Sequence, residues 1–424
     1  MESMDLKPVS QFKNKYIKMW WDTPATFPQL DKIFTSGQQT AKQSDMDAFI
    51  DRMVSEIKKF PAGSNGDCPQ WSSRVRDLIR NAGNGIMELT DGSMDILLEG
   101  GFCKVTSDFI NAAREFDHSV RMDDIMQAMR NVWIMNSIQL LLGLDVKYTT
   151  SLFAYSMLYP YTDNYLDAPD ISLDEKRKIS AKFRLRLDGK PVEAINPYES
   201  ALFKLVGMIE AQYPRKDNNR VYDSILAIHD AQQESLLQQY GNASPYETDI
   251  MGISFEKGGT SVLADAYLAK GSLTEAEAAF MFGFGIFLQL TDDAQDAKID
   301  LKNGHMTMFS QTAGKWPLDS ITNRLFNFTY GILDSDSCFF APGMNELKNV
   351  IRNNCTFLLL GAIAHNKEMY SKSYIERMEK HSPFRFKYMQ QLYKRIGKEF
   401  GKLNRKSSGK PMDAAIAKAL AQKC

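Results

Sequence analysis

The chain has 424 residues, of which 44% are hydrophobic and 24% charged, and its net charge at pH 7 is -1. This balance is typical of a globular protein, and a net charge close to zero gives no signature of nucleic-acid binding. The five cysteines are scattered and lack metal-ligand spacing, which fits a reducing cytoplasm. No basic-then-apolar leader opens the chain, and no apolar run reaches the roughly 18 residues of a membrane span. We therefore expect a cytoplasmic protein without a membrane span.

Apolar residues recur at three- and four-residue intervals along most of the chain, whereas convincing alternating strand patterns are absent. This periodicity predicts an all-α protein. Thr274 and Glu277 form a capping-box pattern that marks the start of one long apolar helix. The predicted helices cover residues 106–116, 122–143, 148–167, 198–213, 219–240, 260–270, 274–300, 317–334, 344–380 and 384–404.

Composition changes along the chain predict three segments. Residues 1–70 are less regular, hold Pro24, Pro28 and Pro61, and are expected to form an N-terminal extension. Residues 71–380 are expected to form one all-α domain, because no linker long enough to separate domains appears between residues 100 and 380. Residues 381–424 are rich in lysine and arginine and are expected to form a basic C-terminal helix and tail.

Two acidic clusters stand at the ends of long apolar stretches, at residues 163–167 and 289–300. A carboxylate in an apolar setting is costly unless a positive charge joins it. In the second cluster, Gln289, Asp296 and Asp300 share a helix face with Asp293, and Asp292 lies at the margin of that face. This arrangement places several like charges on one stripe of a helix.

In the first cluster, Asp163 and Asp167 are spaced one helical turn apart. Like charges at this spacing destabilise a helix by about 0.2–0.5 kcal/mol per pair. In the second cluster, Lys298 and Lys302 project to the far side of the helix and do not neutralise the stripe. The two clusters together predict a site for divalent cations, since Mg²⁺ prefers oxygen ligands. A solvated acidic surface is the alternative.

The two clusters carry a resemblance to a known superfamily. The stretch Phe287–Asp296, followed by Asp300, resembles the second aspartate-rich motif of trans-prenyl diphosphate synthases, Phe-Gln-x-x-Asp-Asp-x-x-Asp. Residues 163–167 resemble their first motif, Asp-Asp-x-x-Asp, and the order and separation of the motifs match as well. Residues 100–380 are thus similar to the all-α class I isoprenoid synthases. The chain length resembles large bacterial terpene synthases and the squalene and phytoene synthase branch.

The resemblance implies a fold, a reaction and a set of ligands. The implied fold is an isoprenoid-synthase helical bundle with a central active-site cavity, in a superfamily where homodimers are common. The implied reaction is Mg²⁺-dependent ionisation of an allylic prenyl diphosphate, with diphosphate release and formation of a cyclised or hydroxylated terpene. Asp163, Asp167, Asp293 and Asp296 are the implied catalytic residues. The implied ligands of a cluster of two or three Mg²⁺ ions are Asp163, Asn164, Asp167, Asp292, Asp293, Asp296 and Asp300.

The chain departs from the family pattern at two positions. Asn164 replaces the second aspartate of the first motif, and His305 follows Gly304 where chain-elongating synthases often carry a lysine. No clear counterpart of the paired arginines for a homoallylic co-substrate follows the first motif. Two alternatives therefore stay open. One is a prenyltransferase that condenses prenyl diphosphates, and the other is a non-catalytic helical scaffold with a degenerate site.

Further residues are candidates for substrate binding. Lys257 precedes two glycines and a predicted helix, where backbone N–H groups at a helix N-terminus can meet an anion. A simple turn is the alternative there. Tyr159, Phe282 and Ile286 are candidate walls for the prenyl chain, with plain core packing as the alternative. Gln289 and His305 complete the set of candidate substrate-binding residues.

Overall fold

The structure, a computed structural model, describes residues 7–60, 69–167, 171–239, 244, 247–335, 338–339 and 343–406. All regular structure in these ranges is helical, so the predicted all-α class is confirmed. The helices of the first part of the chain are α1 (Lys7–Asp22), α2 (Ser36–Lys58), α3 (Pro69–Gly85), α4 (Asp91–Glu99), α5 (Phe102–Phe116) and α6 (Met122–Leu141).

The central helices follow in chain order. They are α7 (Thr150–Asp167), α8 (Leu173–Leu187), α9 (Pro197–Gln212), α10 (Asn219–Ser235), α11 (Ile250–Lys270) and α12 (Glu275–Asn303). The last helices are α13 (Met308–Thr312), α14 (Asp319–Leu333), α15 (Met344–His365), α16 (Lys372–Glu379) and α17 (Phe386–Lys406). Short 3₁₀ turns lie at Arg215–Asp217, Leu236–Gln239 and Lys367–Met369.

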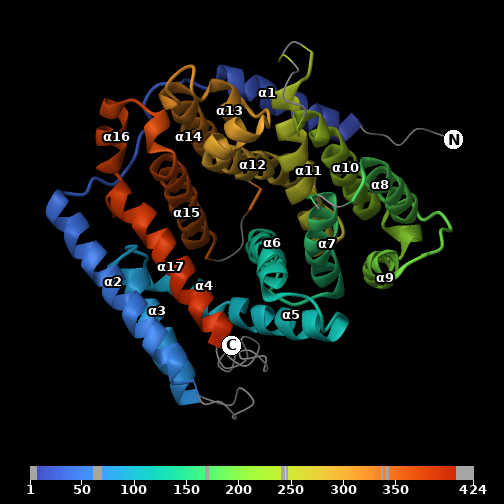
Figure 1. The fold of residues 1–424 in the computed structure, drawn as a ribbon, viewed down its shortest axis with the longest axis horizontal. Helices are drawn as coiled ribbons and strands as arrows, with labels where there is room; N and C mark the ends of the chain where they lie inside the picture. Colours follow the sequence, from blue (N-terminus) through green and yellow to red (C-terminus); the bar gives the residue numbers. More distant parts are fainter. Residues whose placement is uncertain are drawn as a thin grey trace.

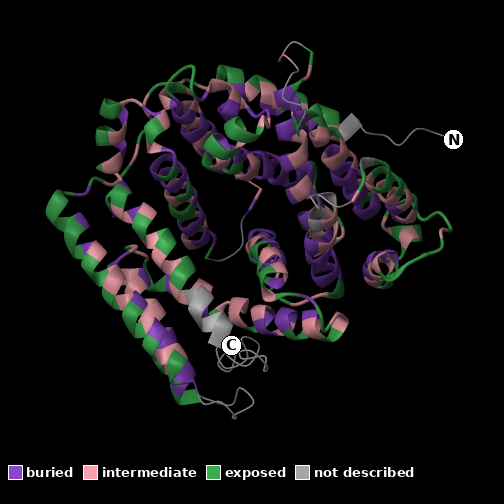
Figure 2. Cartoon of the chain, viewed as in Figure 1, coloured by how far each residue is buried: buried purple, intermediate pink, exposed green. Residues whose placement is uncertain are grey.

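Two clusters of buried apolar side chains meet at α11. One cluster joins α11 to α1, α12, α14 and α15, and includes Phe255 and Phe282. The other joins α11 to α5, α6, α7, α9 and α10, and includes Leu268 and Phe153. Figure 1 shows α7 to α10 on one side of α11 and α12, with α14 and α15 on the other. Figure 2 shows α11 and α12 buried over most of their length, whereas α2 and α17 expose one side.

Glycines allow α11 and α12 to approach closely. A Cβ atom on Gly285 would lie 2.1 Å from the carbonyl oxygen of Gly258, a distance that no side chain tolerates. A Cβ atom on Gly259 would lie 2.5 Å from the ring of Phe282. The two helices therefore touch backbone to backbone, and this contact fixes their register.

The N-terminal segment is more regular than its sequence indicates. Residues 7–22 and 36–58 are helical, in contrast to the expected irregular extension. Tyr16 of α1 donates a hydrogen bond to the carbonyl oxygen of Ala279 at 2.7 Å, and Trp20 is 2% exposed. The available signal was the four-residue spacing of Phe12, Tyr16 and Trp20, which places all three on one helix face.

Two predicted helix boundaries are wrong. The helix predicted at 260–270 begins at Ile250, where the Asp249 side chain caps it by accepting a hydrogen bond from the backbone N–H of Gly252. The helix predicted at 344–380 is broken into α15 and α16. Asn366 lies at the break and donates hydrogen bonds to the carbonyl oxygens of Ala294 and Gln295, a tertiary contact without a local sequence signal. Among the described residues, no helix combines the length and apolar character that crossing a membrane requires.

The glycine contact gives a stability prediction. We expect Gly285→Ala to lower the free energy of unfolding by about 1–3 kcal/mol, because the added methyl group forces α11 and α12 apart. Urea denaturation followed by circular dichroism measures the change. Gly397→Ala in α17 is the control, since its new Cβ would meet nothing within 4 Å. That control should gain about 0.5–1 kcal/mol from helix propensity, and equal effects of the two substitutions would contradict the prediction.

Candidate functional site

Hydrogen bonds show how α7 and α11 are aligned. The Ser151 hydroxyl donates to the carbonyl oxygen of Leu268 at 3.0 Å, and the hydroxyls of Tyr159 and Ser261 lie 2.7 Å apart. Moving forward along α7 thus means moving backward along α11, so the helices are antiparallel. One further turn places the last turn of α7, residues 163–167, beside the first two turns of α11.

The helix α12 runs antiparallel to α11 as well. Gly258 faces Gly285, and Ser254 at the start of α11 donates a hydrogen bond to Asp293 Oδ2 at 3.0 Å. The helices α7 and α12 therefore run parallel to each other. Their C-terminal parts, which hold the two predicted acidic segments, lie at the same end of the bundle.

Asp293 is the most buried of the acidic residues on α12. It is 5% exposed, and both of its carboxylate oxygens accept hydrogen bonds. Oδ1 accepts from Gln289 Nε2 at 2.8 Å, which confirms that these two side chains share a helix face. Burial raises the pKa of Asp293 to about 6, although the bonds from Gln289 and Ser254 act in the opposite direction.

We call Asp292, Asp293, Asp296 and Asp300 the α12 acidic cluster. Asp292 is exposed, and Asp296 and Asp300 are half-buried. The pKa of Asp296 is raised by burial and by the charge of Asp292. The pKa of Asp300 rises to about 7 because of burial and because the other three aspartates lie close to it. The structure thus brings together the four aspartates of the second motif, and their charges oppose one another.

Two basic side chains lie near this cluster. The positive charge of Lys257 lowers the pKa of both Asp293 and Asp300, although burial and neighbouring carboxylates outweigh it. Gly304 ends α12 in the left-handed conformation, and His305 folds back so that its Nδ1 lies 3.5 Å from Asp300 Oδ1. Burial and the charge of Lys257 lower the pKa of His305. The imidazole is therefore neutral at pH 7, and its contact with Asp300 is not an ion pair.

The position of Lys257 differs from the expectation. Both the predicted helix N-terminus and the alternative turn at Lys257-Gly258-Gly259 are wrong, because these residues lie in the interior of α11. The two glycines allow α12 to pack closely against α11. Their backbone N–H groups lie in the interior of a continuous helix and not at a helix N-terminus. An anion near this position would therefore contact the ammonium group of Lys257 and not backbone N–H groups.

The structure describes the first acidic motif, residues 163–167, only in part. Its backbone forms the end of α7, but the side chains of Asp163, Asn164 and Asp167 lie outside the described residues. Tyr159, one turn before this segment, lines a small cavity of about 30 Å³ together with Phe183. A cavity of this size holds about one water molecule.

The predicted apolar wall residues pack in the core. Phe282 and Ile286 are 0% exposed. The Phe282 ring lies 5.7 Å from that of Phe12 and 6.2 Å from that of Tyr16, so α1 covers it. A contact with substrate at either residue stays a prediction.

Three residues that sequence reasoning missed hold the acidic end of α12 in place. Gln238 Nε2 donates to Ser254 Oγ at 3.1 Å, and Ser254 in turn donates to Asp293. The carbonyl oxygen of Gln238 also accepts a hydrogen bond from the Met306 backbone N–H at 2.8 Å. These hydrogen bonds link the 3₁₀ turn Leu236–Gln239, α11, α12 and the segment after α12. No sequence spacing indicates them, because the partners come from four separate elements.

A further carboxyl group lies deeper in the bundle. Asp265 of α11 is 1% exposed, and burial raises its pKa well above the usual range. Asn131 of α6 donates to both Asp265 Oδ1 at 3.0 Å and Ser156 Oγ of α7 at 3.2 Å. Asp265 thus joins the polar contacts that hold α6, α7 and α11 together.

The carboxylate oxygens of the α12 acidic cluster are candidate metal ligands. Within the described part of the chain, no three His, Cys, Asp or Glu side chains are placed to hold one metal ion. One helix spaces Asp296 and Asp300 a full turn apart, and Asp293 is turned toward Ser254. The oxygen donors suit Mg²⁺, which binds through one or two carboxylates and keeps several waters. A complete site therefore needs donors from a second element or from the substrate.

Comparisons with protein-family models, with curated proteins and with solved structures found no match to this chain. The likeness to the class I isoprenoid synthases thus rests on the two aspartate-rich motifs and their order. Membership of that superfamily stays a prediction.

The raised carboxyl pKa values give a pH prediction for the metal-free protein. Between about pH 4 and pH 7 Asp293 and Asp300 bind more protons in the folded state than in the unfolded state, because burial raises their pKa values to about 6 and about 7. The contribution of these two groups to the free energy of unfolding should therefore fall as the pH rises through this window. Asp300→Asn should make the fall shallower, as measured by denaturation midpoints in EDTA at several pH values.

The exposed Asp45 of α2 provides the matched control for this experiment. Asp45→Asn should leave the pH dependence as it is in the wild-type protein. Parallel curves for wild type and Asp300→Asn would show that Asp300 does not titrate in this window.

Proposed function

We propose that the chain is a class I terpene synthase that ionises an allylic prenyl diphosphate with the help of Mg²⁺. The observation that carries this proposal is the α12 acidic cluster, in which burial raises the pKa of Asp293, Asp296 and Asp300 and the charges of neighbouring aspartates raise it further. Like charges held at such cost call for a cation. The end of α7, with the other acidic motif, lies at the same end of the bundle by helix register.

The directions of α7 and α12 add to the need for a cation. Residues 163–167 form the last turn of α7, and Asp300 lies in the last turn of α12. The C-terminus of a helix carries a partial negative charge, which disfavours acidic side chains there. A cation held by carboxylates at these helix ends would relieve both the repulsion between the carboxylates and their unfavourable placement.

Each residue has a distinct part in the proposed reaction. Bound Mg²⁺ supplies positive charge that stabilises the leaving diphosphate. Asp296 and Asp300 offer oxygen ligands on one wall, while Ser254 and Gln289 hold the carboxylate of Asp293 in place. Lys257 offers an ammonium group to the diphosphate from α11.

The product of ionisation is an allylic carbocation, which water would quench. A dry, shaped pocket is therefore needed beside the acidic end. Tyr155 and Tyr159 lie one turn apart on α7, with ring centroids 5.5 Å apart, below the acidic segment of that helix. Aromatic faces can stabilise a cation. Both tyrosines are candidates to line the pocket that receives the prenyl chain.

Product analysis tests the reaction directly. Purified chain is incubated with Mg²⁺ and allylic diphosphates of increasing length, and diphosphate release and products are followed by mass spectrometry. The proposal expects release from one allylic substrate alone. A requirement for added isopentenyl diphosphate would instead identify a prenyltransferase. Absence of release with any substrate would favour the non-catalytic scaffold.

Substitution of Asp296 tests the role of the acidic cluster. Asp296→Asn should lower turnover by about 100- to 1000-fold, or roughly 2.7–4 kcal/mol, as is typical when one preorganised charge stabiliser is removed. Calorimetry without substrate should show weaker Mg²⁺ binding by the same variant. Asp45→Asn is the control and should match the wild type in both assays. Unchanged turnover in Asp296→Asn would refute the assignment.

Lys257 is tested through substrate affinity. Lys257→Gln should raise KM by about tenfold or more, since a hydrogen bond to a charged group contributes about 1.5–3 kcal/mol. Lys302→Gln is the control, because Lys302 is exposed near the C-terminal end of α12, the helix that carries the acidic cluster. Equal KM values for the two variants would mean that Lys257 does not bind the diphosphate.

A further inference from the structure

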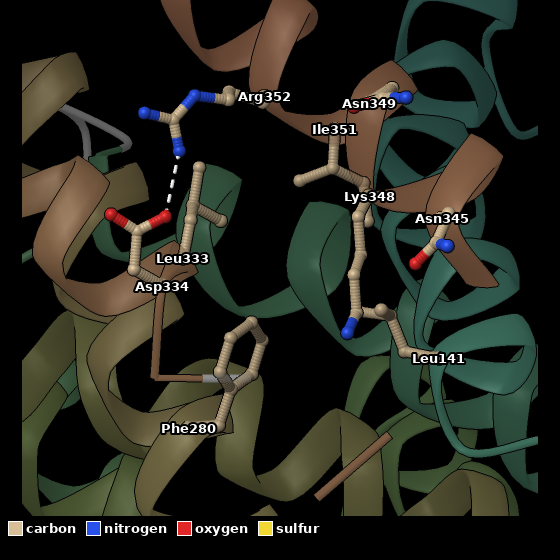
Figure 3. Close-up of a pocket in the computed structure, with 9 residues that line it drawn as sticks. All are labelled: Leu141, Phe280, Leu333, Asp334, Asn345, Lys348, Asn349, Ile351 and Arg352. Carbon is tan, nitrogen blue, oxygen red and sulfur yellow. Dashed lines mark hydrogen bonds and ion pairs between the residues drawn. The ribbon is translucent and has the colours of Figure 1, made fainter. Parts of the chain in front are cut away.

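A cavity of about 420 Å³ lies between α6, α12, α14 and α15. Figure 3 shows its lining, which comes from all four helices. Its apolar part is formed by Leu141 of α6, Phe280 of α12, Leu333 of α14 and Ile351 of α15. Ligand sites in proteins commonly have volumes of about 300–1,000 Å³, so this cavity is large enough for a small molecule.

The cavity is separate from the α12 acidic cluster. Phe280 precedes Asp293 by 293 - 280 = 13 residues in α12, which is about 20 Å along the helix at 1.5 Å per residue. The same 13 residues rotate the side-chain direction by about 140 degrees, at 100 degrees per residue. A ligand in the cavity therefore does not touch the carboxylates of the acidic cluster.

Contacts between α14 and α15 fix two walls of the cavity. Arg352 Nη1 donates to Asp334 Oδ1 at 2.9 Å, and the guanidinium lies 4.2 Å from the centre of the Tyr330 ring. Tyr330 is itself tied to Thr356 of α15 by hydroxyls 2.8 Å apart. The distance between these walls is thus set by the fold, and the cavity is formed before any ligand arrives.

The charged side chains of the described lining already have partners. Asp334 and Arg352 form the ion pair drawn in Figure 3, and their side chains are 68% and 35% exposed. Lys348 also has an interaction of its own. A charged ligand would therefore give up its water without gaining a free countercharge, which is costly. This balance of charge favours a neutral ligand.

The lining changes from apolar to polar between its floor and its rim. Leu141 and Phe280 are only 2% and 3% exposed, whereas Asn345 and Asn349 are exposed. These two asparagines are one turn apart on the same face of α15. A carboxamide both donates and accepts hydrogen bonds, as a hydroxyl or an amide group of a ligand does.

We propose that this cavity is a second ligand site, which binds a neutral amphipathic molecule with one hydroxyl or amide head group. The head group meets the carboxamides of Asn345 and Asn349 at the rim. The apolar chain packs against Leu141, Phe280 and Leu333 on the floor. A few polar groups beside a mainly apolar wall are typical of small-molecule sites. This binding does not depend on the reaction proposed for the acidic cluster.

Binding is tested on the full chain with 1-octanol as the probe. Isothermal titration calorimetry should show saturable binding of one molecule per chain. Octanoate and octylammonium, which carry the same chain on a charged head, should bind at least about tenfold more weakly. Ethanol, which lacks the long chain, should not saturate. Failure of 1-octanol to saturate would overturn the proposal, as would equal or tighter binding of either charged probe.

Two variants tie the binding to this cavity. Asn345→Trp should weaken 1-octanol binding by about tenfold or more by filling the entrance. Asn349→Leu should weaken it by about two- to tenfold, the usual value of one neutral hydrogen bond. Both positions are exposed, so both variants should fold.

Asn353 provides the matched control for both variants, since it is exposed on α15 but lies outside the lining. Asn353→Trp and Asn353→Leu should bind 1-octanol as the wild type does. Wild-type affinity in Asn345→Trp would place the ligand elsewhere, and wild-type affinity in Asn349→Leu would refute recognition by the carboxamides. Equal losses in the Asn345 and Asn353 variants would also overturn the proposal.

Discussion

The backbone contact between α11 and α12 is the constraint on which the candidate site depends. Because Gly258 and Gly285 have no side chains, the two helices touch directly, and their register brings Ser254 within hydrogen-bond distance of Asp293. A shift of one turn would remove the Ser254 donor and leave Oδ2 of the buried Asp293 carboxylate without its hydrogen bond, which costs about 1–3 kcal/mol. Packing and polar chemistry are thus linked in one pair of helices.

The two halves of α12 lie in different chemical environments. Toward its C-terminus α12 carries four aspartates whose charges oppose one another, and near its N-terminus Phe280 lines a cavity between α6, α14 and α15. The long apolar stretch between them is buried from several sides by α1, α11, α14 and α15. This burial makes α12 a rigid support, and rigid elements position functional side chains more accurately than loops do.

The all-α class, the helix α12 and the shared face of Gln289 and Asp293 could be predicted because periodicity and local spacing encode them. The start of α11 was misplaced because Gly258 and Gly259 read locally as a turn, whereas tertiary packing requires them inside a helix. The break after α15 was missed because Asn366 is positioned by contacts with α12.

The sequence by itself determined the helical class, the two acidic motifs and their positions near helix ends, since these depend on residue type and on intervals of three and four. The tertiary structure decided which of these residues meet. It placed Gln238 beside Ser254 and Ser254 beside Asp293, and it raised the carboxyl pKa values through burial. It also created the cavity between α6, α12, α14 and α15. These features join residues from separate elements, and they follow from packing, which no local pattern records.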